Sequence, residues 1–153
     1  MTIQTPPLAR TFITGATGFV GSAIIAKAGE GSESFTALVR KTTTNLANVK
    51  QVEGELDPLS DLNKCLSQHE AVVHCAAQSQ IAKNASKADV DGLYKINVEA
   101  TRNLAEQAAS VGVKTFVFIS SAKVYGEESS TPFTIHAPYN PQDHYARSKM
   151  LAE

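Results

Sequence analysis

The stretch TGATGFVG at residues 14–21 decides how this chain folds, because its three glycines stand at the junction of a predicted strand and a predicted helix. An apolar run at 11–13 precedes it, and apolar residues follow with helical spacing, at Phe19, Val20, Ala23, Ile24 and Ala28. The glycines form GxxGxxG, close to the GxGxxG fingerprint, in which glycines permit a tight turn, close approach of a pyrophosphate and close packing of helix on strand. The free N–H groups of the new helix would face the phosphates. The stretch therefore predicts a phosphate-binding turn, although this spacing also occurs in ordinary strand-to-helix turns.

Strand and helix signals alternate along the rest of the chain. Further strands are predicted at 34–39, 48–53, 71–75 and 113–119. Asp57-Pro58 has the pattern of an N-cap followed by proline at the first helical position, which predicts a helix with one apolar face, formed by Leu59, Leu62 and Leu66. A long helix is predicted over 87–110, with Asn97 and Thr101 as polar residues on its apolar stripe, and a last helix begins near 140–143.

Each connection between consecutive strands is long enough for a helix, which indicates a parallel sheet. We therefore expect an α/β fold, a doubly wound parallel sheet of the Rossmann type that stops after the fifth strand and the start of the following helix. Residues 1–9 are interpreted as a flexible leader and residues 10–153 as one domain. In such sheets, ligands bind at the carboxyl ends of the strands.

Composition narrows the classes of function. The net charge of −1, with both signs interspersed, provides no basic surface for nucleic acid. The longest apolar run, at 116–119, is far too short to cross a bilayer, and no signal peptide precedes the domain, so we expect a cytoplasmic protein with no membrane partner. Cys65 and Cys75 are then expected to stay reduced, and the histidines show no metal-ligand spacing.

Charged residues follow two of the predicted strands. Arg40 and Lys41 end the second strand, where an NAD-specific site would place an Asp or Glu against the ribose. An arginine there can instead bind a 2′-phosphate, which favours NADP and leaves NAD possible; the alternative is a solvated basic pair. Glu55 and Leu56 follow the third strand, where the carboxylate could accept from an adenine amine or simply face solvent.

Tyr145 and Lys149 lie four residues apart, which places them on one face of the last predicted helix. A free tyrosine has a pKa of about 10, and a neighbouring ammonium favours its phenolate, so the pair suits proton transfer. Ser120 and Ser121 end the predicted fifth strand and would place hydroxyls at the same edge of the sheet. The Tyr/Lys spacing and a serine pair at the end of a strand are each common by chance. Their combination, in this order after a glycine turn, is what indicates a catalytic site.

Five segments stand in order along the chain: TGATGFVG at 14–21, HCAA at 74–77, NVEAT at 97–101, FVFISSAKVYG at 116–126 and YARSK at 145–149. Together they resemble the extended branch of the short-chain dehydrogenase/reductase superfamily, the NAD(P)-dependent epimerase/dehydratase family. The resemblance implies that Tyr145 is the catalytic acid–base, that Lys149 binds the nicotinamide ribose and tunes Tyr145, and that Ser121 holds the reacting oxygen. It implies cofactor contacts at Gly15, Thr17, Gly18, Phe19, Val20, Gly21, Arg40, Glu55, Leu56, Ala76, Ala77, Asn97, Tyr145 and Lys149.

Two further residues are interpreted in the light of this resemblance. Asn97 matches the family's mid-helix asparagine, and we expect it to organise the site from behind, since a buried amide needs partners. His74 ends the fourth strand beside the expected cofactor groove, and there we expect the backbone to matter more than the imidazole.

The resemblance implies hydride transfer between a nicotinamide cofactor and a carbon that bears oxygen, with a nucleotide-sugar as the small-molecule substrate. Ala122 and Lys123 stand where family dehydratases carry an acidic pair, which disfavours dehydration. Epimerases, 4-ketoreductases and steroid- or flavonol-type dehydrogenases remain open. A non-catalytic NAD(P)-binding or redox-sensing module also remains open, although such a module would not need Ser121, Tyr145 and Lys149.

The resemblance also bears on length. Family members generally run to twice this length, with a C-terminal part that builds the substrate pocket. We therefore expect that part to be absent here, the chain being either the N-terminal half of a longer protein or naturally short. The helix of Tyr145 would then be mobile or held by another chain, so we expect a homo-oligomer with weak or absent turnover.

Overall fold

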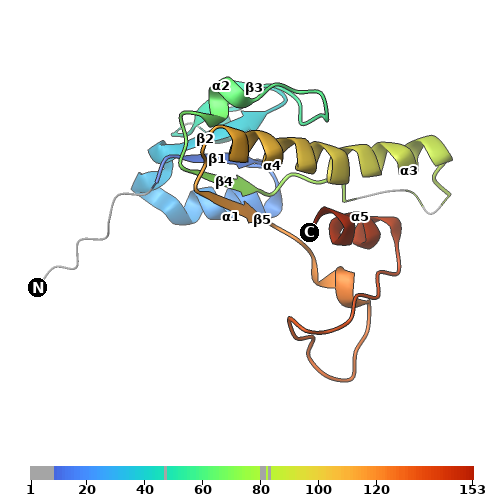
Figure 1. The fold of residues 1–153 in the computed structure, drawn as a ribbon. Coiled ribbons are helices and arrows are strands. Elements are labelled where there is room, and N and C mark those ends of the chain that lie inside the picture. Colours follow the sequence, from blue (N-terminus) through green and yellow to red (C-terminus); the bar gives the residue numbers. More distant parts are fainter. Residues whose placement is uncertain (1–8, 47, 80–81, 83) are drawn as a thin grey trace, which may run out of the picture.

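The sheet at the centre of the protein is parallel and five-stranded (Figure 1), in the order β3-β2-β1-β4-β5. The structure, a computed structural model, describes residues 9–46, 48–79, 82 and 84–153, so residues 1–8 of the predicted leader lie outside it. The strands are β1 (Thr11–Thr14), β2 (Phe35–Val39), β3 (Lys50–Glu53), β4 (Ala71–His74) and β5 (Thr115–Phe118). All four strand pairs are parallel, which confirms the five predicted strands and the fold class.

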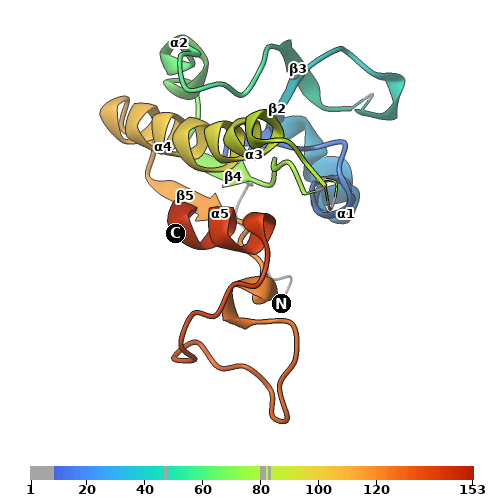
Figure 2. The ribbon, with the colours of Figure 1, turned by 90° about the vertical axis from the view of Figure 1, so that its right-hand side faces the viewer.

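Helices cover both faces of this sheet (Figures 1 and 2). They are α1 (Phe19–Ala28), α2 (Asn63–Leu66), α3 (Lys87–Tyr94), α4 (Ala100–Ser110) and α5 (His144–Ala152). Short 3₁₀ segments are η1 (Gly29–Ser34), η2 (Thr44–Leu46) and η4 (Ala122–Tyr125), and η3 (Lys95–Glu99) is a π-helical turn. Within the described part of the chain, no helix is long and apolar enough to cross a membrane.

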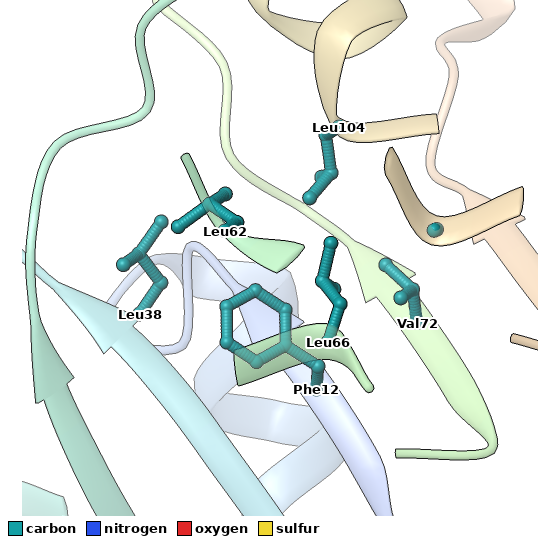
Figure 3. Close-up of a cluster of buried hydrophobic side chains, with 7 residues drawn as sticks. Phe12, Leu38, Leu62, Leu66, Val72 and Leu104 are labelled. Carbon is teal, nitrogen blue, oxygen red and sulfur yellow. The ribbon is translucent and has the colours of Figure 1, made fainter. Parts of the chain in front are cut away.

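The strands divide their side chains between two buried clusters, one on each face. On the α4 side, Phe12 packs with Leu38, Leu66, Val72 and Leu104 (Figure 3). The cluster on the α1 side consists of Ile13, Ala16, Phe35, Ala37, Val39, Leu46 and Val49, with Ile24, Ile25 and Ala28 packed against it. Because successive side chains of a strand point to opposite faces, neighbours in β1 enter different clusters. The sheet is therefore doubly wound, as predicted.

The long helix predicted over 87–110 is confirmed, with one interruption. It begins with a capping box, in which Ser86 Oγ accepts from the Asp89 N–H and the Asp89 carboxylate accepts from the Ser86 N–H. The π turn η3 separates α3 from α4, and in it the Ala100 N–H bonds to the Lys95 carbonyl, five residues back. Turns of this kind often mark functional sites, and this one contains the buried Asn97.

The helix predicted to start at Asp57 is wrong in its position. Asp57 instead accepts from the Leu59 N–H at 2.9 Å and pairs with Lys95 Nζ at 2.9 Å, so its side chain stabilises a turn. Leu59 is 89% exposed, and only Leu62 and Leu66 of the predicted apolar face are buried. The helix, α2, is a single turn that begins at Asn63 with Leu62 as its N-cap residue.

The order of the strands fixes where a ligand can bind. The chain crosses from β1 to β2 on one side of the sheet, and it later returns to add β4 and β5 on the other side of β1. Such a reversal leaves a crevice at the carboxyl ends of the two central strands. Here those ends are the residues that follow β1 and β4.

Candidate functional site

Two of the three glycines in the turn after β1 are required because the chain's own backbone leaves no room for a side chain there. Gly15 has a φ of +70°, and a Cβ there would lie 2.6 Å from the Ala76 backbone nitrogen, just beyond β4. A Cβ on Gly21 would lie 2.2 Å from the Gly15 carbonyl oxygen, so this glycine lets α1 pack on the turn. Gly18 is different, because its φ is −79° and the nearest atom to an added Cβ is the Gly15 oxygen at 3.2 Å.

The start of α1 faces solvent beside this turn. Gly18 is the N-cap of α1 and provides no capping side chain. The first N–H groups of a helix have no partners within it, so they are available to an anion. Thr17, Phe19 and Val20 are exposed here, Phe19 to 93%.

The charged residues predicted to lie near the cofactor, Arg40 and Glu55, follow β2 and β3, on the side of β1 opposite to β4. The Gly54 N–H donates to the Val39 carbonyl at 2.9 Å and holds the two strand ends together. Arg40 and Glu55 both extend from these ends as exposed side chains. Leu56 instead packs against the cluster on the α4 side.

The end of β4 contacts the glycine turn directly. The Ala76 N–H donates to Thr14 Oγ1 at 3.2 Å, and Ala76 lies against Gly15. Ala77 follows it and is half-buried. The segments that follow the two central strands therefore lie directly against each other.

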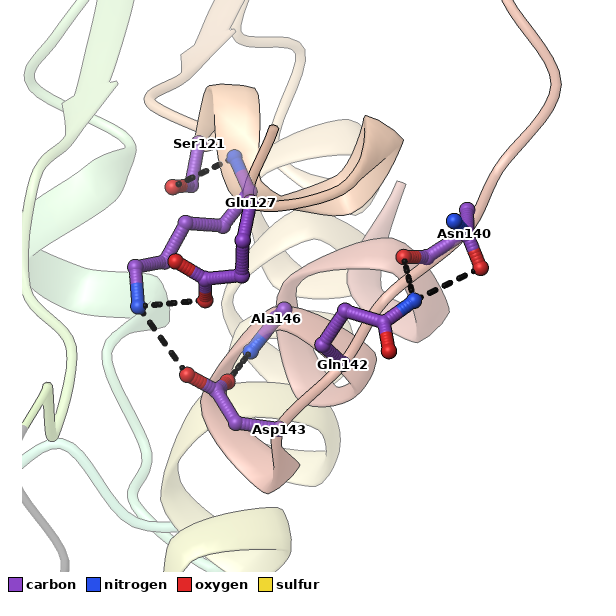
Figure 4. Close-up of polar contacts among 7 residues, drawn as sticks. Ser121, Glu127, Asn140, Gln142, Asp143 and Ala146 are labelled. Atoms are coloured by element: carbon purple, nitrogen blue, oxygen red, sulfur yellow. Dashed lines mark hydrogen bonds and ion pairs between the residues drawn. The ribbon is translucent and has the colours of Figure 1, made fainter. Parts of the chain in front are cut away.

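The N-terminus of α5 is tied to the segment that follows β5 (Figure 4). Asp143 caps α5, with Oδ1 accepting from the Ala146 N–H at 2.6 Å. Its other oxygen, Oδ2, lies 3.1 Å from Lys123 Nζ, and the same ammonium pairs with Glu127 Oε1 at 2.9 Å. Ser121 is the N-cap of η4, and its Oγ accepts from the Lys123 N–H at 3.3 Å. Lys123 thus connects the segment of Ser121 to the first turn of the helix that carries Tyr145.

Lys149 is the most unusual charged group of the site, since only 2% of it is exposed. Its Nζ lies 3.8 Å from the centroid of the Phe118 ring, at the last residue of β5. Burial lowers the pKa of Lys149 to about 8, although nearby Cys75 and Glu153 partly oppose that shift. Tyr145, one turn earlier, is half-buried. Lys149 therefore lies against the end of β5 and near Cys75, which follows β4, and Tyr145 lies one turn earlier on the same helix.

Asn97 is buried and uses its whole amide group, which is consistent with the expectation that it organises the site from behind. Its Oδ1 accepts from the Gln78 N–H at 2.8 Å, and its Nδ2 donates to the Gln78 carbonyl at 2.9 Å and to Ser148 Oγ at 2.9 Å. Asn97 thus joins the loop after β4 to α5.

Sequence reasoning missed the imidazole of His74. The ring is fully buried, with Nδ1 2.6 Å from Thr14 Oγ1 and Nε2 2.9 Å from Thr101 Oγ1. Burial, with a smaller contribution from Lys149, lowers the pKa of His74 to about 4. Threonines on otherwise apolar elements, at Thr14 and Thr101, were the available sequence signal for a buried polar partner.

The whole described domain matches a known family. The model of the NAD dependent epimerase/dehydratase family covers residues 11–153. The chain belongs to this family. Its resemblance to the epimerase/dehydratase branch is thereby confirmed.

Among curated relatives, this epimerase/dehydratase chain is 33% identical to a UDP-glucose 4-epimerase of Vibrio cholerae over 144 residues, covering 92% of the chain and 44% of the relative. It is 31% identical to a UDP-glucose 4-epimerase of Neisseria gonorrhoeae, covering 92% and 45%. It is also 30% identical to a decarboxylating sterol-4-alpha-carboxylate 3-dehydrogenase of Dictyostelium discoideum, covering 93% and 45%. The chain therefore spans less than half the length of each of these relatives.

Solved structures of the superfamily share the fold. A short-chain dehydrogenase/reductase superfamily protein of Agrobacterium tumefaciens with bound NAD aligns with a TM-score of 0.78 and 28% identity, over 93% of this chain and 42% of that one. MoeE5 in complex with UDP-glucose and NAD aligns with a TM-score of 0.79 and 26% identity, over 93% and 46%. NAD is thus the cofactor in two structures similar to this epimerase/dehydratase domain.

Proposed function

We propose that this domain binds a nicotinamide dinucleotide and serves hydride transfer at a hydroxyl or keto carbon of a nucleotide-sugar. The observation that supports the proposal is Lys149, an ammonium with 2% exposure that lies one helical turn from Tyr145 and against Phe118, the last residue of β5. A buried charge is costly unless a partner compensates it. Hydroxyls of a bound ribose and the phenol of Tyr145 would be suitable partners.

The glycine turn fits the diphosphate of such a cofactor. Gly18 has no strong internal reason to be glycine, yet a side chain there would stand at the open start of α1. A backbone that must approach phosphates needs such a position. We propose contacts from the turn at Gly15, Thr17, Gly18, Phe19, Val20 and Gly21, and from neighbouring strand ends at Ala76 and Ala77.

The choice of dinucleotide depends on the end of β2. Arg40 is exposed there and supports NADP, because its guanidinium could bind a 2′-phosphate. The similar structures of a superfamily protein and of MoeE5 contain NAD, which supports the alternative. We propose NADP as the preferred cofactor, with Glu55 and Leu56 beside the adenine.

The chemistry would use three side chains of this chain. The cofactor, when bound, supplies or accepts the hydride. Tyr145 would move the proton of the reacting oxygen, the Lys149 ammonium would favour its phenolate form, and Ser121 would hold the oxygen as charge develops. Asn97 would keep α5 in place, through the Ser148 hydroxyl that it contacts.

Nucleotide-sugar is the substrate class that the relatives support best. Two relatives named as UDP-glucose 4-epimerases are 33% and 31% identical to this chain. Lys123 is engaged with Glu127 and Asp143 at the position where dehydratases carry an acid, which supports epimerase or reductase chemistry over dehydration. The sterol dehydrogenase relative supports a second candidate, a steroid-type dehydrogenase.

Turnover tests this proposal. The chain is incubated with NAD(P) and UDP-glucose, or with NAD(P)H and a 4-keto-sugar nucleotide, and products are followed alongside a Tyr145→Phe variant. From this chain we expect weak or absent product formation, and a homo-oligomer by sedimentation. From a version extended to the length of the relatives we expect product formation, which Tyr145→Phe loses. If the extended version binds the dinucleotide saturably but turns over no substrate, the non-catalytic module is favoured. If it oxidises a 3-hydroxysteroid instead of a nucleotide-sugar, the second candidate is favoured.

A further inference from the structure

A network of hydrogen-bonded, buried polar side chains extends from the end of β1 to helix α5. His74 is at its centre, with Thr14 Oγ1 2.6 Å from Nδ1 and Thr101 Oγ1 2.9 Å from Nε2. His74, Thr14 and Thr101 are exposed by 0%, 1% and 4%. Buried polar groups of this kind must satisfy one another, because water cannot.

The direction of each hydrogen bond follows from its neighbours. The Thr101 hydroxyl donates its one proton to the Asn97 carbonyl at 2.8 Å, so towards His74 it can only accept. Nε2 of His74 must therefore carry a proton. At the other end, Thr14 Oγ1 accepts from the Ala76 N–H at 3.2 Å and remains free to donate to Nδ1. When the ring is neutral and protonated at Nε2, every group from the Ala76 N–H to the Thr101 hydroxyl donates to the next one along the network.

A charged ring would break this order. With a proton on Nδ1 as well, Thr14 Oγ1 would accept from both His74 and Ala76, and its own proton would need another acceptor. Burial and the nearby Lys149 ammonium disfavour that form, since both lower the pKa of His74. Geometry and charge therefore select the same neutral tautomer.

The hydrogen-bond network continues to the helix that carries Tyr145. The side chain of Asn97 donates to Ser148 Oγ at 2.9 Å, and Ser148 Oγ donates to the Tyr145 carbonyl at 2.7 Å. The residue after Thr14 is Gly15, the first glycine of the turn. One connected set of hydrogen bonds thus joins the turn after β1, the π turn η3 and α5.

We propose that His74 is a positioning residue: as the neutral Nε2–H tautomer, it fixes the glycine turn relative to the helix that carries Tyr145 and Lys149. Its role in orienting a reaction rests on the proposed function, whereas the link itself does not. An apolar side chain could fill the same space but could not bridge a donor on one side and an acceptor on the other. The imidazole therefore does more than the strand backbone that the sequence pointed to.

Nuclear magnetic resonance on the unliganded chain tests the link. Long-range ¹H–¹⁵N spectra assign the tautomer of His74, and amide hydrogen exchange reports on residues 15–18 and 145–149. Two matched variants are compared, Thr101→Val, which keeps the shape and removes the hydroxyl, and Thr101→Ser, which retains it. We expect a neutral Nε2–H ring in the wild type. We also expect exchange at both segments to be about fivefold faster in Thr101→Val, the factor for one lost hydrogen bond, and restored in Thr101→Ser.

Two results would overturn the inference. One is an Nδ1–H or charged ring in the wild type at neutral pH, which needs no variant to fold. The other is equal exchange at 145–149 in the two variants. Dinucleotide titration of the same wild-type sample addresses the proposed function separately, so absence of binding with the expected spectra would reject that function and leave the link intact.

Discussion

The ammonium of Lys149 lies 3.8 Å from the centroid of the Phe118 ring, and the same ring stacks on His74 with 5.7 Å between centroids. The Phe118 ring therefore contacts both of these buried side chains. A ring face attracts a cation, so Phe118 opposes the desolvation that burial imposes on Lys149.

The first prediction concerns this ring. Phe118→Leu keeps an apolar side chain and removes the ring, so the pKa of Lys149 should fall below about 8, by roughly 0.5–1 unit for a cation–π contact of about 1 kcal/mol. Carbon-13 labelling of lysine Cε followed by pH titration measures it. An unchanged or higher pKa in Phe118→Leu would show that the ring does not stabilise the ammonium.

The second prediction concerns alkaline stability. Since the folded pKa of Lys149, about 8, lies below the ordinary lysine pKa of 10.5, the unfolded chain binds more protons between these two pH values. The free energy of unfolding should therefore rise as pH increases through this window, and the cost of burying the charge should be fully present below pH 8. Lys149→Met should be more stable than wild type at pH 7, by up to about 3 kcal/mol, and should lack that part of the rise. Urea denaturation at several pH values tests this, and a variant that is less stable at pH 7 contradicts it.

The third prediction concerns acid. His74 has a folded pKa of about 4, below the ordinary histidine pKa of 6.5, so its contribution to stability is complete above pH 6.5 and is lost as pH falls towards 4. The loss should amount to about 3 kcal/mol at most. His74→Asn should be less stable at pH 7 but show a shallower acid slope than wild type, whereas replacement of the exposed His136 by Asn should leave the slope unchanged. Equal slopes in His74→Asn and wild type would count against a buried neutral ring.

The fourth prediction separates folding from binding within the glycine turn. Gly21→Ala places a Cβ 2.2 Å from the Gly15 oxygen and should destabilise the fold by about 1–3 kcal/mol or more. Gly18→Ala places its Cβ at 3.2 Å from that oxygen and should cost little stability, yet weaken dinucleotide binding by about tenfold or more. Gly92→Ala, in α3 with open space around it, is the matched control and should be neutral or stabilising. Thermal unfolding and a binding titration on the three variants test the separation, which fails if Gly18→Ala binds like wild type.

The fifth prediction concerns the choice of cofactor. Arg40→Asp should shift preference from NADP towards NAD, because a carboxylate can accept from a ribose hydroxyl and repels a 2′-phosphate. Arg102→Asp changes the net charge equally on an exposed position of α4 and should leave the preference unchanged. If NADP affinity is the same in Arg40→Asp and wild type, the interpretation of Arg40 is wrong.

Local patterns were sufficient for most of the fold. Four of the five strands are short and largely apolar, β3 (Lys50–Glu53) is mostly polar, and their alternation with helices left only a parallel sheet. The start of α2 could not be predicted, because the Asp57 carboxylate binds Lys95, a residue 38 positions later in the chain, as well as the nearby Leu59 N–H. An N-cap pattern cannot reveal such a long-range partner.

The candidate site shows the same division. Tyr145 and Lys149 were singled out by their spacing together with the segments that precede them. The near-complete burial of Lys149 instead depends on Phe118 and on the packing of α5 against η3, α3 and η4. The role of His74 depends on two threonines that stand 60 and 27 positions away in the chain. Contacts of this range exist only in the folded sheet.

The central claim is that the glycine turn binds a dinucleotide beside the buried Lys149. A fluorescence titration of NADPH, repeated with NADH, measures this most directly on the wild-type chain, with Gly18→Val and Lys149→Met alongside. The account predicts saturable enhancement of the nicotinamide emission for wild type, lost in Gly18→Val and reduced in Lys149→Met. No saturable binding of either nucleotide to a folded wild-type chain, or equal binding by all three proteins, would contradict it.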